Sequence, residues 1–190
     1  MKLQPLFAPL TVVSALLSAG VMAADGSISF TGEVTASACR VLGAGQVGSL
    51  ISTSTNISLP GVSLEALNAV GEYAGHTSFK ILLAGCQTQA GLSNVYTTFT
   101  TTSPAEMDGN VMANTETTSP ATGIGLAILD ATFSQIDLNG GARRDIDHPL
   151  PATDSSIVME LNYAVAYKVL ALPVTAGGVR GQVNYTISYN

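Results

Sequence analysis

The chain has 190 residues, of which only 11% are charged, and its 13 acidic side chains outnumber the 7 basic ones to give a formal net charge of −6. This acidity argues against nucleic-acid binding, which rewards clustered Lys and Arg. Charged residues are scarce while Ser, Thr, Gly, Ala and Val are plentiful, a composition that excludes a disordered chain and is typical of an exported all-β domain.

The first 23 residues have the features of an export signal. A positive start at Lys2 is followed by an apolar stretch from Leu10 to Ala19 and then by small residues that suit signal peptidase. We expect cleavage after Ala23, with cleavage after Ala24 as the alternative. The apolar stretch is too short to span a bilayer and no later segment is long enough, so a membrane-spanning protein is not expected. Removing 23 of 190 residues leaves 167, the size of about one domain.

The processed chain opens with a strand pattern of period two. Ile28, Phe30, Gly32 and Val34 fall on one face of an extended segment, and polar residues alternate with them on the other face. A first strand with nothing before it offers an open edge to another chain. We therefore expect residues 24–38 to form an extension that is separate in role from a domain at residues 39–190.

Two cysteines, Cys39 and Cys86, remain after processing. In an oxidising compartment such an even pair predicts a disulfide. Closing a loop of roughly 50 residues would stabilise the fold by about 4 kcal/mol in the chain-entropy model. A metal or redox pair is the alternative, but there is no CxxC spacing and no histidine near either cysteine.

The stretch Gly43–Gly48 matches the dinucleotide fingerprint GxGxxG and follows a possible strand. The residues after it, Ser49–Ser58, are mostly Ser, Thr and Ile, which do not open a helix, and no βαβ unit follows. A turn is therefore predicted here rather than a nucleotide site.

Alternating or continuous apolar runs predict most of the remaining elements. Strands are expected at residues 79–85, 95–102, 123–130, 157–169 and 183–190, and turns at 43–48, 103–109, 139–151 and 173–181. Only Val62–Val70 could form a short helix, with Ser63 as its N-cap. Many short strands, turns rich in Gly and Pro and almost no helix predict a β-sandwich.

The main charged cluster is Arg143–Pro149, which contains one of the two histidines, His148. A catalytic or Ca²⁺ site could use this histidine with Asp145 and Asp147. Neither a calcium-loop spacing nor a nucleophile signature such as GxSxG is present, so we expect a solvated loop with local ion pairs. The second histidine, His76, stands alone, and no catalytic residue, metal or cofactor is expected.

The chain closes with a strand at residues 183–190, and no later strand follows to cover its outer edge. Val183, Tyr185, Ile187 and Tyr189 alternate with polar residues up to Asn190. An uncovered edge strand with an apolar row invites pairing with another chain.

Five features in order resemble the type 1 (chaperone–usher) fimbrial subunit family, and together they cover nearly the whole processed chain. They are the segment Gly26–Val34 before Cys39, the strand Phe79–Cys86, the central segment Gly123–Asp130, Tyr189 as the penultimate residue, and Gly177 fourteenth from the end.

This resemblance implies an incomplete immunoglobulin-like β-sandwich, an all-β pilin fold that lacks its last strand. In the family, an apolar groove lies beside the C-terminal strand, and a periplasmic chaperone fills it until another subunit's N-terminal extension replaces the chaperone strand at an outer-membrane usher. Carried onto this chain, the donor strand is Ile28, Phe30, Gly32 and Val34. The groove and chaperone-pairing residues are Gly177, Val183, Tyr185, Ile187, Tyr189 and Asn190.

The expected function is a structural subunit of an adhesive fimbria, exported through the periplasm to the cell surface and paired with copies of itself or with sister pilins. It is not expected to be an enzyme, because Trp is absent, His is scarce and no acid/base pair is evident. Two alternatives stay open: a minor adaptor or terminator subunit of the same fibre, and an autonomous secreted immunoglobulin-like binding module.

Overall fold

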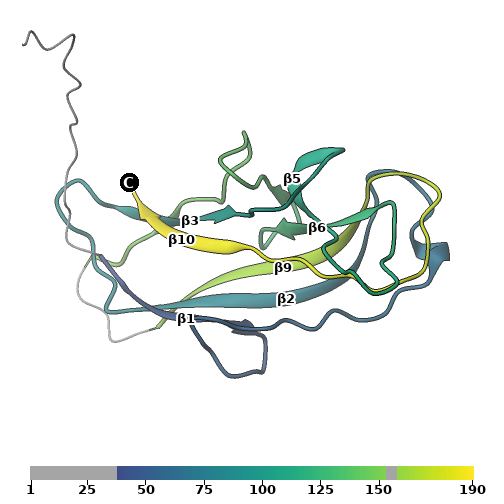
Figure 1. The fold of residues 1–190 in the computed structure, drawn as a ribbon. Coiled ribbons are helices and arrows are strands. Elements are labelled where there is room, and N and C mark those ends of the chain that lie inside the picture. The colour runs from purple at the N-terminus through teal and green to yellow at the C-terminus, as the bar shows by residue number, and fades with distance from the viewer. Residues whose placement is uncertain (1–37, 153–157) are drawn as a thin grey trace, which may run out of the picture. The chain divides into compact units, whose positions relative to one another are not determined.

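A computed structural model of the chain describes residues 38–152 and 158–190, which form a two-layered β-sandwich (Figure 1). The predicted export signal and the predicted donor-strand residues Ile28, Phe30, Gly32 and Val34 lie outside the described residues. One layer is a sheet in the order β1-β2-β9-β6-β5-β4, with β7 paired to β6, and the other is a sheet in the order β10-β3-β8. The strands are β1 (Arg40–Gln46), β2 (Tyr73–Ala84), β3 (Asn94–Thr100), β4 (Pro104–Ala105), β5 (Asp108–Ala113), β6 (Ile124–Leu129), β7 (Gln135–Ile136), β8 (His148–Pro149), β9 (Met159–Val169) and β10 (Asn184–Tyr189). These strands all pair in antiparallel fashion.

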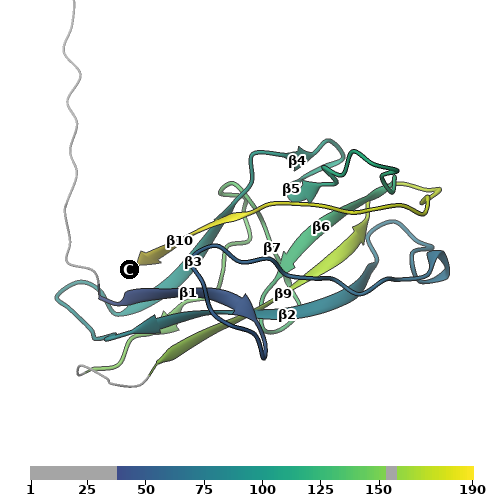
Figure 2. The same ribbon diagram turned by 60° about the horizontal axis from the view of Figure 1, so that its bottom comes forward.

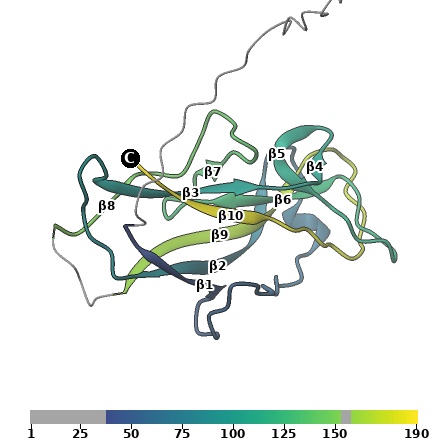
Figure 3. The same ribbon diagram turned by 60° about the vertical axis from the view of Figure 1, so that its left-hand side comes forward.

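The core lies between the two sheets, as Figure 3 shows for β3 and β10 above β9 and β2. The alternation predicted around residues 79–85 places Ile81 and Leu83 in the interior with no exposed surface. Three aromatic rings join the layers: Phe99 of the small sheet packs edge-to-face against Tyr163 of β9 at a centroid distance of 5.1 Å. Phe79 of β2 lies 5.5 Å from the same tyrosine ring.

The strands predicted from alternation are confirmed as β2, β3, β6, β9 and β10. Every residue of β6 is buried, as expected for the apolar segment Gly123–Asp130, because both faces of the strand are covered. Leu126 and Ile128 pack in the main core cluster, and Ala127 and Leu129 pack in a second cluster. The disulfide between Cys39 and Cys86 is also confirmed. It joins the beginning of β1 to the end of β2.

The turn predicted at Gly43–Gly48 is wrong for its first half, since residues 43–46 belong to β1. A bulge separates Val41 from Gly43, and Gly43 adopts φ +132°. A Cβ on Gly43 would lie 2.5 Å from the carbonyl carbon of Ser52, where the chain returns beside β1. These glycines therefore allow two main-chain segments to approach each other, and the resemblance to a nucleotide loop has no structural counterpart.

The helix expected at residues 62–70 is only a single 3₁₀ turn at Leu64–Ala66. Ser63 occupies the N-cap position, but its side chain makes no capping hydrogen bond. The chain turns at Gly71, whose N–H donates to the carbonyl of Val169 at 2.8 Å, and leaves no length for a second turn before β2 begins. The short strands β4, β7 and β8 were not predicted, because two residues carry no detectable period. The predicted turn at 103–109 is wrong where it contains β4 and the first two residues of β5, a six-residue strand that was not predicted either.

We predict that removing the disulfide lowers the free energy of unfolding without changing the fold. In the variant Cys39→Ser/Cys86→Ser, the 47-residue separation is no longer closed in the unfolded chain, which should cost about 4 kcal/mol. Guanidinium unfolding of the variant measures this loss, and reduced wild-type protein is the control. An unchanged midpoint for both samples would contradict the stabilising role.

Candidate functional site: the open edge of strand β10

Strand β10 forms one border of the small sheet. It pairs along its whole length with β3, from Asn184 opposite Thr100 to Tyr189 opposite Val95. Figure 2 shows β10 along the rim of the sandwich, on the side that also carries β1. Within residues 38–152 and 158–190, no other strand pairs with the opposite edge of β10. Its outward main-chain N–H and C=O groups are therefore free to pair with an added strand.

The apolar side chains of β10 point toward the core but are only half-buried. We call Val183, Tyr185, Ile187 and Tyr189 the inward row of β10; all four pack against the main core cluster. The neighbouring β3 differs sharply, because its inward residues Val95 and Phe99 are 0% and 2% exposed. An inward row that remains half-exposed beside a fully buried one lacks cover on its outer flank.

A second extended segment runs along the same side of the sandwich, before the 3₁₀ turn (Figure 2). Ile57 and Leu59 alternate there with exposed residues and pack against the same core cluster as the inward row of β10. Among the described residues, no hydrogen bond between two main-chain groups involves residues 53–62; the carbonyl of Pro60 accepts from the Tyr167 hydroxyl at 3.2 Å and the N–H of Ser54 donates to the Ser52 hydroxyl at 3.3 Å. The segment makes no ladder with another strand, so one added strand could pair with its main chain and cover the half-exposed apolar side chains at once.

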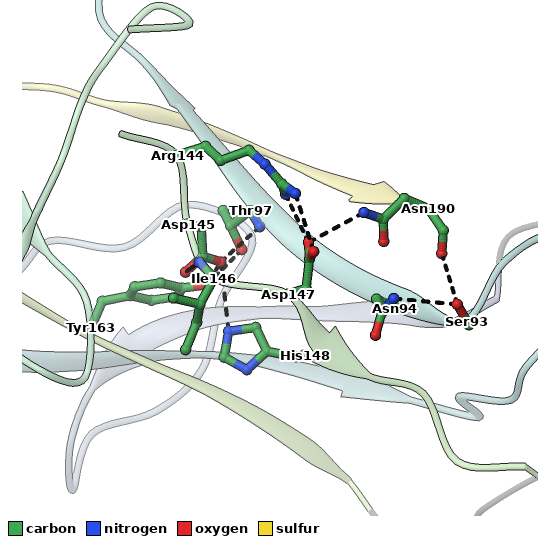
Figure 4. Close-up of polar contacts among 10 residues, drawn as sticks. All are labelled: Ser93, Asn94, Thr97, Arg144, Asp145, Ile146, Asp147, His148, Tyr163 and Asn190. Atoms are coloured by element: carbon green, nitrogen blue, oxygen red, sulfur yellow. Dashed lines mark hydrogen bonds and ion pairs between the residues drawn. The ribbon is translucent and has the colours of Figure 1, made fainter. Parts of the chain in front are cut away.

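The C-terminal end of β10 is held in place by polar contacts (Figure 4). The main-chain oxygen of Asn190 accepts hydrogen bonds from the N–H groups of Ser93 at 2.7 Å and Asn94 at 2.9 Å. The Asn190 side-chain amide donates to Asp147 at 3.3 Å, and Asp147 is paired with Arg144. Tyr189 donates from its hydroxyl to the carbonyl of Cys39 at 3.4 Å, a contact between the two sheets.

The inward row of β10 carries no charge. Burial raises the pKa of Tyr185 and the pKa of Tyr189, so both phenols stay neutral at physiological pH. The charges at this end of the sheet lie in the exposed Arg144–Asp147 pair, in which the hydrogen bond from Arg144 lowers the pKa of Asp147. The surface next to β10 is therefore suited to apolar side chains on a main-chain ladder.

The structure brings together most of the predicted groove residues. Val183, Tyr185, Ile187 and Tyr189 share one face, with Val183 directly before the strand and Asn190 directly after it. Gly177 is the exception: it lies before β10, outside the pairing strand. There a Cβ would come within 2.3 Å of the main-chain nitrogen of Ala121, so the glycine permits close packing of two loops.

Two parts of this region were not predicted from the sequence. The segment with Ile57 and Leu59 was not recognised, although two apolar residues alternating within a polar stretch were the available signal. The expected solvated loop at Arg143–Pro149 is right for the exposed Arg144–Asp147 pair and wrong for Asp145, whose side chain is 0% exposed. Nothing local distinguishes Asp145 from Asp147, because its partners lie in β3 and β9.

Comparison with known proteins settles the family. The model of a family described as "Fimbrial protein" matches residues 28–190. The chain belongs to this family of fimbrial proteins. It is 31% identical to the F17 fimbrial protein of Escherichia coli over 183 residues, covering 95% of this chain and 96% of that protein. It is 32% identical to the major fimbrial subunit SMF-1 of Stenotrophomonas maltophilia, covering 88% of this chain and 94% of that protein.

Solved structures agree on the fold of this fimbrial protein. A subunit from a chaperone–usher pilus superposes with a TM-score of 0.56 at 19% identity, covering 88% of this chain and 96% of that one. A Burkholderia pseudomallei antigen described as a type I fimbria protein gives a TM-score of 0.53 at 22% identity, covering 77% of this chain and 93% of that one. The fold is thus the immunoglobulin-like pilin sandwich that the sequence predicted.

Family membership also bears on function and location. Proteins of this family form extracellular fimbriae and are structural, which confirms the expectation that the chain is not an enzyme. In the described part of the chain, none of the helices has the length and hydropathy needed to cross a bilayer.

Gly177 provides a test of the loop packing that precedes β10. We predict that Gly177→Ala costs roughly 1–3 kcal/mol, because its Cβ would overlap the main chain around Pro120 and Ala121. The matched control is Gly61→Ala, where a Cβ meets no atom within 4 Å. Urea unfolding of both variants measures the difference, and equal stabilities would contradict the packing role of Gly177.

Proposed function

We propose that this fimbrial protein is a structural subunit of an adhesive surface fibre and polymerises by donor-strand exchange. In this mechanism the extension at residues 24–38 of one copy supplies the strand with Ile28, Phe30 and Val34 that lies beside β10 of the next, while Ala38 at its end stays buried in its own domain. The observation that supports it most directly is the inward row of β10, half-buried next to an open main-chain edge. The unpaired segment with Ile57 and Leu59 provides a second edge for the same incoming strand.

The proposed donor segment has suitable length and chemistry. Residues 24–38 would span roughly 50 Å when extended, whereas the six residues of β10 need about 20 Å, so enough chain remains for a connection between subunits. Its apolar face, Ile28, Phe30 and Val34, would be buried against the inward row of β10. Burying these three side chains would contribute on the order of 5–8 kcal/mol before the entropy of association is subtracted.

The proposed partners follow from the family. A periplasmic chaperone would occupy the open edge of β10 after export, and an outer-membrane usher would direct its exchange for another subunit's extension. We assign the chain to the major subunit of the fibre rather than to an adaptor or terminator, because its relative SMF-1 is a major fimbrial subunit that aligns over 94% of its length.

We expect the domain without residues 24–36 to be stabilised in trans by a synthetic peptide of that segment. Binding to the folded state alone raises the melting temperature in proportion to the logarithm of peptide concentration over its dissociation constant. Thermal unfolding with and without peptide measures this shift. A domain that is already stable and indifferent to the peptide would instead indicate a complete sandwich and favour the autonomous binding module.

The groove side of the pairing is tested at Ile187. We predict that Ile187→Ser weakens peptide binding by about tenfold, since a partly covered isoleucine contributes roughly 1.4 kcal/mol to an apolar contact. Thr186→Ser is the matched control, because Thr186 is exposed and points to the other face of β10. Titration calorimetry compares the two, and equal affinities would contradict the assigned face.

The donor side is tested at Gly32. We predict that Gly32→Leu blocks polymerisation while leaving the chaperone-bound subunit folded, because a side chain at this position would prevent close approach of the strand. Thr31→Leu, on the opposite face of the donor segment, should polymerise normally. Fibre yield by electron microscopy is the readout, and normal fibres from the Gly32→Leu variant would rule out the proposed donor register.

A further inference from the structure

The small sheet has a second border, on the side of β3 that faces away from β10. Strand β8 covers only the beginning of this border, with Asn94 opposite Pro149 and Val95 opposite His148. From Thr97 onward, the described residues contain no strand that pairs with β3 on this side. A bare border of this kind would accept a strand as readily as β10 does.

Two side chains occupy this border in place of a strand. The N–H of Thr97 donates to the Asp145 carboxylate at 2.9 Å. Two residues on, the carbonyl of Phe99 accepts from the main-chain N–H of Asn139 at 3.0 Å. The N–H of Thr101, directly after β3, donates to the side-chain oxygen of Asn139 at 2.8 Å. These alternate positions are the ones whose main-chain groups point away from β10. We call Asp145 and Asn139 the edge caps of β3.

Asp145 is fixed in place by the core (Figure 4). Its side chain is 0% exposed, and besides Thr97 it accepts the hydroxyl proton of Tyr163 at 2.7 Å and the N–H of Ile146 at 2.9 Å. Burial and the Asp145 charge raise the pKa of Tyr163, which keeps the phenol protonated as a donor. A buried carboxylate is tolerated only when it is fully hydrogen-bonded, so Asp145 cannot swing away and expose Thr97 without a large cost.

Asn139 is held by its backbone conformation. It adopts φ +57°, a left-handed conformation that asparagine tolerates better than other side-chain-bearing residues, and Gly140 follows it at φ +79°. This tight turn directs the N–H and the side-chain oxygen of the same residue toward β3. One exposed residue therefore satisfies two groups of the border.

We propose that Asp145 and Asn139 close the β3 border against strand addition, so that the small sheet can accept a further strand from another copy only at β10. A subunit with two accepting borders could pair wrongly or branch, whereas a subunit with one gives a linear order. The inference rests on β3 alone, and it holds whether or not the strand that joins β10 is the one proposed above.

The test removes the caps with the least disturbance to the fold. Asn139→Gly keeps the left-handed turn and the hydrogen bond to Phe99 but loses the bond to Thr101. Asp145→Ala is combined with Tyr163→Phe, so that the Tyr163 hydroxyl is not left without its acceptor. The buried Thr97 hydroxyl, which bonds to that of Tyr163 at 2.8 Å, loses its partner equally in this variant and in the control. Tyr163→Phe alone is the matched control, because it retains the Asp145–Thr97 bond.

Amide hydrogen exchange on the full processed chain is the measurement, with light scattering for size and circular dichroism for folding. In dilute samples of the variant that carries all three substitutions, we expect the amides of Thr97 and Thr101 to exchange at least tenfold faster than in wild type. When the sample is concentrated, oligomers should form and the same two amides should become protected again, since the new strand lies on β3. Tyr163→Phe alone should show neither effect.

Two results would overturn the proposal: fast exchange with no added oligomers at high concentration, or oligomers that leave Thr97 and Thr101 unprotected. The second result would mean association through β10 instead. If the triple variant does not fold, the same exchange measurement is made on the amide of Thr101 in the single variant Asn139→Gly. This variant should fold, because Asn139 is exposed and its loss leaves the core intact. Unchanged behaviour of Thr101 in that variant would also overturn the proposal.

Discussion

The antiparallel ladder between β3 and β10 is the interaction on which the functional surface depends. Strand β3 is anchored in the core by Val95 and Phe99, which are almost completely buried. Strand β10 has no other strand partner in the described part of the chain, so its position is set by six residue pairs with β3 and by the contacts of Asn190 and Tyr189 at its end. The ladder thus presents a half-buried apolar row and an unpaired main chain in a fixed geometry.

This geometry explains how a small domain can be both stable and incomplete. The larger sheet, the Cys39–Cys86 disulfide and the aromatic contacts of Phe79, Phe99 and Tyr163 form a core that does not rely on the outer flank of β10. The incompleteness is confined to the rim, where the inward row of β10 and the segment with Ile57 and Leu59 face the same opening. In the proposed mechanism, completing the rim is a binding event, and its free energy is available for assembly.

The two borders of the small sheet differ in whether their main-chain groups are open to an added strand. At β10 the main chain is open and the side chains beside it are apolar, which favours a long extended partner. At β3 a buried carboxylate and an asparagine in a left-handed turn take the hydrogen bonds that a strand would make. Burying Asp145 has an electrostatic cost that an apolar residue would avoid, and edge protection gives that cost a purpose.

The sequence by itself determined strands β2, β3, β6, β9 and β10, the disulfide and the apolar row of β10. Period-two alternation is a local property, visible in stretches such as Phe79–Leu83 and Val183–Tyr189. The disulfide was predictable because Cys39 and Cys86 are the only two cysteines of the sequence, so each has a single possible partner within the chain. Only the tertiary structure decided that Gly43–Gln46 continues a strand, that Ile57 and Leu59 face the opening, and that Asp145 is buried. The physical reason is distance along the chain: Asp145 bonds to Thr97, 48 residues away, and Asn139 bonds to Thr101, 38 residues away. Such partners are set by how the sheets stack, which no local pattern of residues encodes.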